Sequence, residues 1–180
     1  MISVEFCWLI LVLVFAVIGA ARGLGKELGT AAIVALSLFA LWLGWDQAGN
    51  MVISLIKRGP FKDLRSQEIK AIYYSLTICF IAFISYEGIT LLFPIKLKGI
   101  LKNAFGFLGG LVNGYLIVGT IWNVAAQADY FLPQLKVVQP PFSDFHNAIV
   151  KYLPVSLMED FSPMPMLMLG MLLLLAVIFK

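Results

Sequence analysis

Three glycines spaced four residues apart lie within an uncharged apolar stretch, residues 104–126. Gly106, Gly110 and Gly114 would line one side of a helix there, and without side chains they would let a second helix approach closely. In a lipid bilayer, where helices gain little by burying apolar surface against each other, such close packing is a main source of helix association. The pattern therefore predicts a membrane protein in which this helix has a tightly packed partner.

The overall composition supports lipid as the surrounding solvent. Hydrophobic residues make up 61% of the 180 residues, charged residues make up 13%, and the mean hydropathy is +0.95. Soluble domains carry about 25% charged residues. The net charge of +3 is modest and no basic run resembles a nucleic-acid-binding surface, so nucleic acid is not an expected partner.

Five hydrophobic segments predict the fold class. A spanning helix needs about 17–25 residues, so four segments are long enough and the fifth is short. The segments comprise residues 6–21, 28–45, 71–93, 104–126 and 164–179. We expect an all-α polytopic integral membrane protein, a four-helix bundle with a fifth C-terminal transmembrane helix. The first segment is interpreted as a retained anchor, because no basic residue precedes it as in a signal peptide.

The connecting segments divide the chain into three predicted parts. Residues 1–126 hold the four long segments, residues 127–162 form a proline-containing extramembrane loop with short helical pieces, and residues 163–180 form the last hydrophobic helix. Within the first part, the connection 46–70 mixes basic residues with the apolar stretch 51–56, which suits a segment lying on the membrane surface.

The last hydrophobic segment and one residue of the fourth segment are expected to face lipid rather than protein. The last segment has one glycine and no polar side chain, so nothing on it specifies a close partner and we expect it to pack loosely at the edge of the bundle. Leu116, in the fourth segment, is the other position expected to face lipid.

Asn113 shares a helix face with the glycine ladder, as does Asn103, because each lies three or four residues from a ladder glycine. The amide of Asn113 could form a hydrogen bond across helices that stabilises their association by on the order of 1 kcal/mol. We interpret the ladder as a packing contact, and a kink that lines a pore is the alternative. The expected partner surface is a stripe of small residues at the start of the second segment: Gly25, Gly29 and Ala32.

Two further polar features are candidate sites. Glu87 is the acid that lies well inside a hydrophobic segment, and an intramembrane carboxylate is by default a functional-site hypothesis. A structural role and a proton or ion role both stay open for it. The second feature is a polar turn between the first two segments, either an interfacial anchor or a polar contact that holds these helices together. It consists of Arg22, Gly23, Lys26 and Glu27.

No sequence motif indicates catalysis, a metal or a cofactor. His146, the only histidine, has Ser143 and Asp144 nearby, but neighbours in a loop do not form a catalytic triad. Nucleophile-elbow, zinc-protease, CxxC and phosphate-loop patterns do not occur. Cys7 and Cys79 lie in apolar segments and are interpreted as small hydrophobic residues. We therefore expect a protein that is not an enzyme and binds no cofactor or metal.

Taken together, two groups of residues resemble the colicin V production family, the CvpA-like bacterial membrane proteins. The first group is an acid near the start, an apolar helix, an Arg-Gly pair and a basic-acidic pair: Glu5, Arg22-Gly23 and Lys26-Glu27. The second is a fourth helix that opens on a polar residue and repeats glycines four apart: Asn103, Gly106, Gly110 and Gly114. Glu5 stands where the family usually has Asp, Asn103-Ala104 replaces a polar-Arg pair, and the fifth segment is not typical.

The resemblance covers about residues 1–130 and carries several expectations. It implies a multi-pass protein of the bacterial inner membrane that acts in toxin production, secretion or envelope maintenance without catalysis of its own. The alternative is a small transporter or proton-coupled channel that uses Glu87 and Asn113. The lipid bilayer would surround the protein, and a second copy or another membrane protein is the candidate partner.

The distribution of basic residues predicts the orientation of the helices. The connection 22–27 and the loop 94–103 lie on the same side and are basic, whereas the acidic segment 127–162 lies on the other side. By the positive-inside rule, the N-terminus is outside and the loop 94–103 is inside. The connection 46–70, which has five basic residues, opposes this assignment.

This orientation can be tested by cysteine labelling. In a chain with Cys7 and Cys79 replaced, a cysteine introduced by Lys98→Cys should react with a membrane-impermeant thiol reagent only after the cells are permeabilised. Labelling in intact cells would reverse the orientation.

Overall fold

The computed structural model describes residues 4–60, 62–87, 91–93, 95, 97–130, 143–160 and 162–178. These residues form helices and connections, with no strand among them. The helices are α1 (Val4–Arg22), α2 (Leu24–Lys57), α3 (Ser66–Glu87), α4 (Gly99–Gln127), α5 (Asp144–Val150), α6 (Pro154–Asp160) and α7 (Met164–Ile178). Parts of the predicted connections lie outside the described residues: Pro94, Lys96 and residues 131–142, which include Pro133, Pro140 and Pro141.

The predicted all-α class is confirmed. The four helices α1 to α4 are each long and apolar enough to cross a membrane. The short α6 and the apolar α7 make an angle of 117° with each other, and this bent pair is either a broken fifth span or a re-entrant loop. The chain is therefore a helical protein with the features of a multi-pass membrane protein.

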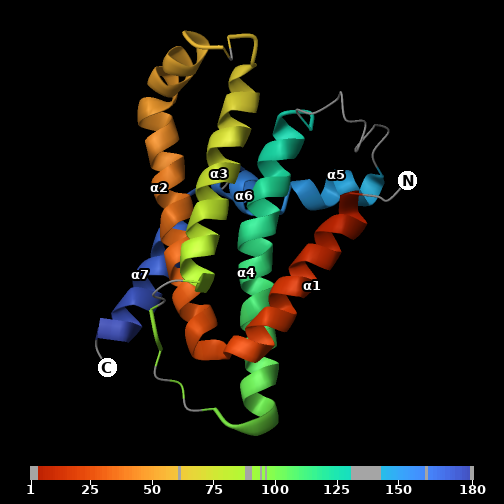
Figure 1. The fold of residues 1–180 in the computed structure, drawn as a ribbon, viewed down its shortest axis with the longest axis vertical. Helices are drawn as coiled ribbons and strands as arrows, with labels where there is room; N and C mark the ends of the chain where they lie inside the picture. Colours follow the sequence, from red (N-terminus) through yellow and green to blue (C-terminus); the bar gives the residue numbers. More distant parts are fainter. Residues whose placement is uncertain are drawn as a thin grey trace.

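Consecutive long helices run in opposite directions (Figure 1). Helices α2, α3 and α4 stand beside one another, whereas α1 crosses α4 at an angle and packs mainly on it. The turn from α1 to α2 and the start of α4 lie at one end of the bundle, which we call the basic end. Helix α5 lies across the bundle near the start of α1, and α7 runs beside α2.

The hydrophobic core lies between α2, α3 and α4. Its members include Val34 and Leu38 of α2, Tyr74 and Ile78 of α3, and Leu116 and Val124 of α4. Leu116 is 3% exposed, so the expectation that it faces lipid is wrong. The second half of α4 contacts other helices around most of its circumference, which leaves this position no lipid-facing side.

The glycine ladder packs against α1. A β-carbon at Gly110 would lie 2.8 Å from Cα of Ala16, and one at Gly114 would lie 3.1 Å from Cα of Val12. The contact is reciprocal, since a β-carbon at Gly19 of α1 would lie 2.7 Å from Cα of Gly110. The backbones of α1 and α4 thus touch, and the expected pairing with the small residues of α2 is corrected.

Those small residues of α2 serve another segment instead. The chain leaves α3 before residue 91, and residues 91–93 run across the start of α2, where Phe93 N donates to Gly25 O at 3.3 Å. A β-carbon at Gly29 would lie 2.8 Å from the carbonyl carbon of Leu91. The third hydrophobic segment therefore ends as an extended strap over α2, and not as a helix to residue 93.

Helix α2 is longer than expected. The second hydrophobic segment was predicted to end at Trp45, but the helix continues to Lys57 and includes the stretch 51–56. The Trp45 ring packs on the rings of Tyr73 and Tyr74 in α3, with centroids 5.8 and 6.4 Å apart. These contacts with α3 hold the polar continuation of α2 in the bundle, so it does not form a separate surface segment.

Basic residues of the connection 46–70 are paired with acids at the end opposite the basic end. Arg65 contacts Glu68 at 3.2 Å and Asp129 at 2.9 Å, and Lys70 contacts Glu159 at 2.6 Å. The pairing of Arg65 and Lys70 reduces the net positive charge that this connection presents, while Lys57, Arg58 and Lys62 form no ion pair among the described residues.

Helix α7 is exposed along much of its surface but has one close contact. Met168 and Leu172 are each 62% exposed, as expected for a helix at the edge. Gly170 is buried, and a β-carbon there would lie 2.6 Å from Cδ2 of Leu36 in α2. The expectation that nothing on this helix specifies a close partner is therefore corrected, because Gly170 does.

The α1–α4 contact predicts a difference between two substitutions on α4. Gly110→Leu would place a large side chain against the α1 backbone, and we expect it to lower the free energy of unfolding in detergent by about 3 kcal/mol. Leu108→Ala is the control, because Leu108 is 54% exposed, and it should change stability by at most about 0.5 kcal/mol. Equal stabilities for both variants would contradict the tight contact.

Candidate functional site

A network of polar groups joins all four long helices next to the turn between α1 and α2. We call it the polar network. Its members are Arg22 of α1, Glu27 and Thr30 of α2, Ser85 and Tyr86 of α3, and Asn113 of α4. A network that draws on every long helix can fix the position of each helix relative to the others.

The carboxylate of Glu27 is the centre of the polar network. Its side chain is fully buried, and Arg22 Nη1 donates to Oε1 at 2.7 Å. The second oxygen accepts from Asn113 Nδ2 at 2.7 Å and from the hydroxyl of Tyr86 at 3.0 Å. Asn113 Nδ2 also donates to the backbone carbonyl of Glu27 at 2.9 Å. One buried carboxylate therefore binds groups from three other helices.

The guanidinium of Arg22 extends the polar network toward α3. Its Nη2 donates to the carbonyl of Ser85 at 2.8 Å, and its Nη1 also donates to Thr30 Oγ1 at 3.3 Å. The guanidinium carbon lies 4.1 Å from the centroid of the Tyr86 ring, which is a cation–π geometry. The Arg22 side chain is 14% exposed, so most of this charge is removed from the surroundings.

Two glycines make the burial of Glu27 possible. Gly23 has a φ of 83°, a conformation that favours glycine, and this lets α2 begin at Leu24 immediately after α1 ends. Gly109 of α4 faces α2, since a β-carbon there would lie 2.7 Å from Cβ of Glu27. The close approach brings Asn113, one turn further along α4, within reach of the carboxylate.

The energetics favour pairing of the two buried charges, although Oδ1 of Asn113 is buried without a hydrogen-bond partner among the described residues. A carboxylate in an apolar, membrane-like interior is expensive when it lacks partners, and removal of one partner from a buried ion pair costs about 3–5 kcal/mol. Glu27 lies in the first turn of α2, where the helix dipole also favours a negative charge. The polar network therefore stabilises the observed arrangement of the four helices.

The predicted intramembrane acid lies elsewhere. Glu87 is the last residue of α3 and is exposed, so it lies at the end of a candidate span and not well inside it. The buried acid is Glu27, which was predicted only as part of the polar turn. Hydropathy placed Glu27 at the edge of a segment, whereas α2 begins before it and α4 covers it. Asn113 does bond across helices, and Asn103 is exposed.

Several members of the site carry little signal in the sequence. Tyr86 and Ser85 contribute a hydroxyl and a carbonyl from α3, and neither stands out in an apolar segment. Gly19 and Gly109 could have been found as small residues next to the polar turn and the ladder. Their partners, however, depend on how the helices cross.

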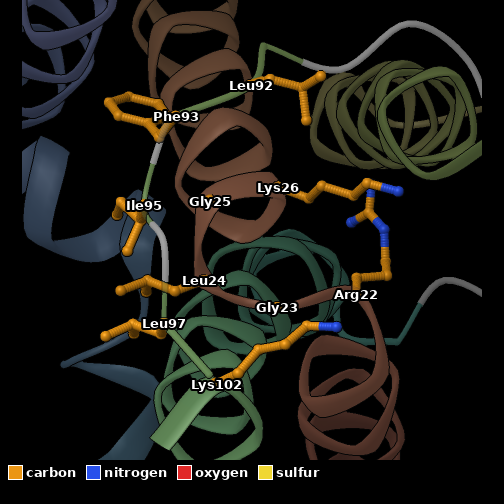
Figure 2. Close-up of a pocket in the computed structure, with 10 residues that line it drawn as sticks. All are labelled: Arg22, Gly23, Leu24, Gly25, Lys26, Leu92, Phe93, Ile95, Leu97 and Lys102. Atoms are coloured by element: carbon orange, nitrogen blue, oxygen red, sulfur yellow. The ribbon is translucent and has the colours of Figure 1, made fainter. Parts of the chain in front are cut away.

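A pocket of about 210 Å³ lies beside the polar network at the basic end (Figure 2). We call it the basic pocket. It is lined by Arg22, Gly23, Leu24, Gly25, Lys26, Leu92, Phe93, Ile95, Leu97 and Lys102. A larger hollow of about 610 Å³ lies between α1 and α3, and it shares Arg22 and Lys26 with the basic pocket.

His146 belongs to a second cluster, at the opposite end of α1. Its Nε2 lies 3.1 Å from the hydroxyl of Tyr130, and its ring lies 5.4 Å from that of Trp122. Burial lowers the pKa of His146, while the charge of Glu5 opposes this shift. Ser143 caps α5 by accepting from the His146 backbone N–H, and its hydroxyl donates to Glu5. The imidazole Nε2 thus contacts the Tyr130 hydroxyl, while the Ser143 hydroxyl contacts Glu5.

Comparisons with protein-family models, with curated proteins and with solved structures return no match for this chain. Within the described part of the chain, no cluster of three or more His, Cys, Asp or Glu side chains could hold a metal ion. Cys7 and Cys79 are free and exposed. The polar network and the basic pocket are therefore the features from which a function is inferred.

The burial of Glu27 predicts a difference between two glutamates. Glu27→Gln should lower the free energy of unfolding in detergent by about 3–5 kcal/mol, because it leaves the Arg22 charge without its carboxylate. The matched control is Glu87→Gln, an exposed position at the end of α3, which should change stability by at most about 0.5 kcal/mol.

A second variant separates loss of the ion pair from loss of packing. When Arg22→Gln is added to Glu27→Gln, the double variant should lose less stability than the sum of the single losses, because neither charge is then left alone. Additive losses, or equal stabilities of Glu27→Gln and Glu87→Gln, would argue against a coupled buried pair.

Proposed function

We propose that this chain is a non-catalytic scaffold protein of the colicin V production type in the bacterial inner membrane. Its role would be in toxin production, secretion or envelope maintenance, exercised through a rigid four-helix unit that presents surfaces to lipid and to other membrane proteins. The observation that carries this proposal is the polar network, which joins α1, α2, α3 and α4 through one buried carboxylate.

The location of the network supports this assignment. Parts of the two groups that resemble the family, the turn at Gly23 and the ladder at Gly106, pack against each other, whereas Glu5 lies at the other end of α1. A β-carbon at Gly106 would lie 3.0 Å from Cα of Gly23, and Glu27 bonds Asn113 beyond the ladder. The residues that carry the resemblance at these positions therefore share a structural role, which is to bring α1, α2 and α4 together.

The state of the polar groups favours a scaffold over a transporter. Both hydrogens of the Asn113 amide are used on Glu27, and Glu27 itself accepts three hydrogen bonds through its carboxylate. A transport site has to release and rebind its ion, and so many simultaneous partners make that release costly. A network with this density of bonds is better suited to hold helices than to carry protons.

One observation keeps the alternative of a proton-coupled transporter or channel under test. The hollow between α1 and α3 is lined by Glu87, Tyr86 and Arg22, so an exposed acid lies near the outer edge of the polar network. A proton path would then lead from Glu87 through Tyr86 to Glu27. In that case Glu87 would be needed for function although it adds little to stability.

Complementation of a bacterial strain that lacks its own colicin V production protein tests the proposal. The chain should restore release of the peptide toxin, measured as growth inhibition of a sensitive strain. Gly110→Leu and Asn113→Leu should abolish release because they disturb the bundle, whereas Glu87→Gln should keep it. Membrane accumulation of each variant is measured by immunoblot alongside.

Three outcomes would contradict the scaffold assignment. Lack of complementation by the unaltered, membrane-inserted chain would exclude the colicin V production role in that host. Loss of function in Glu87→Gln with normal accumulation would favour transport. Proton uptake by vesicles that contain the purified protein, driven by a pH gradient and blocked by Glu87→Gln, would support the same conclusion.

A further inference from the structure

The basic pocket has a division of side chains that the scaffold role does not require. Figure 2 shows the cationic side chains of Arg22, Lys26 and Lys102 on one side of the pocket. The apolar side chains of Leu24, Phe93, Ile95 and Leu97 lie on the other side. A pocket divided in this way suits a ligand that is charged at one end and apolar at the other.

The positive charge of the pocket is not neutralised by its own lining. Among the described residues no acid lines it, and Glu27, the acid closest in sequence, is bound to Arg22 and buried. Lys26 and Lys102 are exposed, and neither forms an ion pair among the residues that the structure describes. Glu87 lines the larger hollow beside Lys26 but does not line this pocket. Two lysine ammonium groups are thus available to an anion.

The backbone adds to this positive potential. The pocket lies where α2 begins at Leu24 and close to where α4 begins at Gly99. The residues that precede these helices, Gly23 and Lys98, make no side-chain capping bond. At the start of α2 the N–H groups of Lys26 and Glu27 donate to Gly23 O, and Glu27 already lies in the first turn. The start of α4 has no acid in its first turn, so this helix end keeps a partial positive charge near the pocket, in addition to the lysines.

The apolar wall comes from the strap that follows α3. Of the pocket residues that follow α3, Phe93, Ile95 and Leu97 lie on the apolar side with Leu24, whereas Leu92 lies on the side of Lys26 (Figure 2). The bond from Phe93 N to Gly25 O holds this part of the chain against α2. The strap places hydrophobic side chains next to lysines at the end of the helices, where the edge of a bilayer would lie. A soluble phosphate compound would gain nothing from such a wall, whereas a lipid would.

We propose that the basic pocket binds the phosphodiester headgroup of an anionic phospholipid, with Lys26 and Lys102 as the phosphate contacts and the strap as the contact for the glycerol and the start of the acyl chains. Basic pockets between membrane helices recognise anionic headgroups in this manner. The shared chemistry is a phosphate anion, and the lipid source is favoured by the apolar wall. This inference is independent of the proposed function, because binding is measured on the purified protein.

The first arm of the test compares sources of phosphate. Purified protein in neutral detergent receives short-chain phosphatidylglycerol, phosphatidylcholine with the same chains, or inorganic phosphate, and the melting temperature is followed against concentration. A ligand that binds only the folded protein raises the melting temperature by mass action. Phosphatidylglycerol should raise it, and the other two should leave it unchanged. An equal rise with inorganic phosphate would overturn the lipid assignment, and no rise with any of them would overturn the site.

The second arm compares positions of lysine. Lys26→Gln with Lys102→Gln should keep the melting temperature of the lipid-free protein, because both side chains are exposed, but weaken phosphatidylglycerol binding by about 30-fold, since each lysine near an anionic headgroup contributes about 1 kcal/mol. The charge-preserving pair Lys26→Arg with Lys102→Arg should retain binding. The matched control is Lys57→Gln with Lys151→Gln, two exposed lysines outside the pocket, which should bind as the unaltered protein does.

The number of tightly bound lipids provides an independent readout. Native mass spectrometry should find a phosphatidylglycerol on the unaltered protein and on the control, and lose it in the double glutamine variant. Equal lipid binding by the double glutamine variant and the control would show that the pocket does not select the lipid. Equal loss in both would show a general effect of surface charge, which also contradicts the proposal.

Discussion

The structure depends on the burial of one carboxylate. Glu27 is removed from solvent at the start of α2, so its charge has to be matched by Arg22 and by donors from α3 and α4. In an apolar environment a buried charge without partners is costly, so displacement of any of the helices that supply these partners would destabilise the bundle. The polar network thus holds the helices together in an environment where burial of apolar surface contributes little.

Close helix contact is the condition for that network. The short side chain of Asn113 reaches the backbone carbonyl of Glu27 because α4 and α2 approach closely, and glycines on α4 provide the room on two sides. Gly110 admits α1, and Gly109 admits the stem of Glu27. The same polar turn has two roles: Arg22 forms an ion pair with Glu27 inside the bundle, and Lys26 is exposed at the edge of the bundle. Arg22 therefore contributes to the stability of the bundle, whereas Lys26, four residues later, contributes to the positive potential of the basic pocket.

Much of the fold could be predicted from the sequence, and the reasons are local. Length and hydropathy are enough to identify four spans, and glycines at a spacing of four are enough to identify a packing face. The ends of helices were less predictable. Trp45 is followed by polar residues, yet α2 continues beyond it, and the Trp45 ring packs on aromatic rings of α3. The chain leaves α3 before residue 91, and residues 91–93 cover Gly25 and Gly29 as an extended strap. Each of these outcomes depends on a contact with another element.

The candidate site, too, was predictable from the sequence only in part. The sequence by itself determined which groups had to be satisfied: an acid and an arginine beside an apolar segment, an asparagine on a glycine-lined face, and an excess of lysine at one end. Only the tertiary structure decided that Glu27 and not Glu87 is the buried acid, that the ladder meets α1 and not α2, and that Tyr86 completes the network. The physical reason is that burial is a property of helix crossing and not of hydropathy: a residue one turn from a segment end is exposed or enclosed according to which helix lies over it.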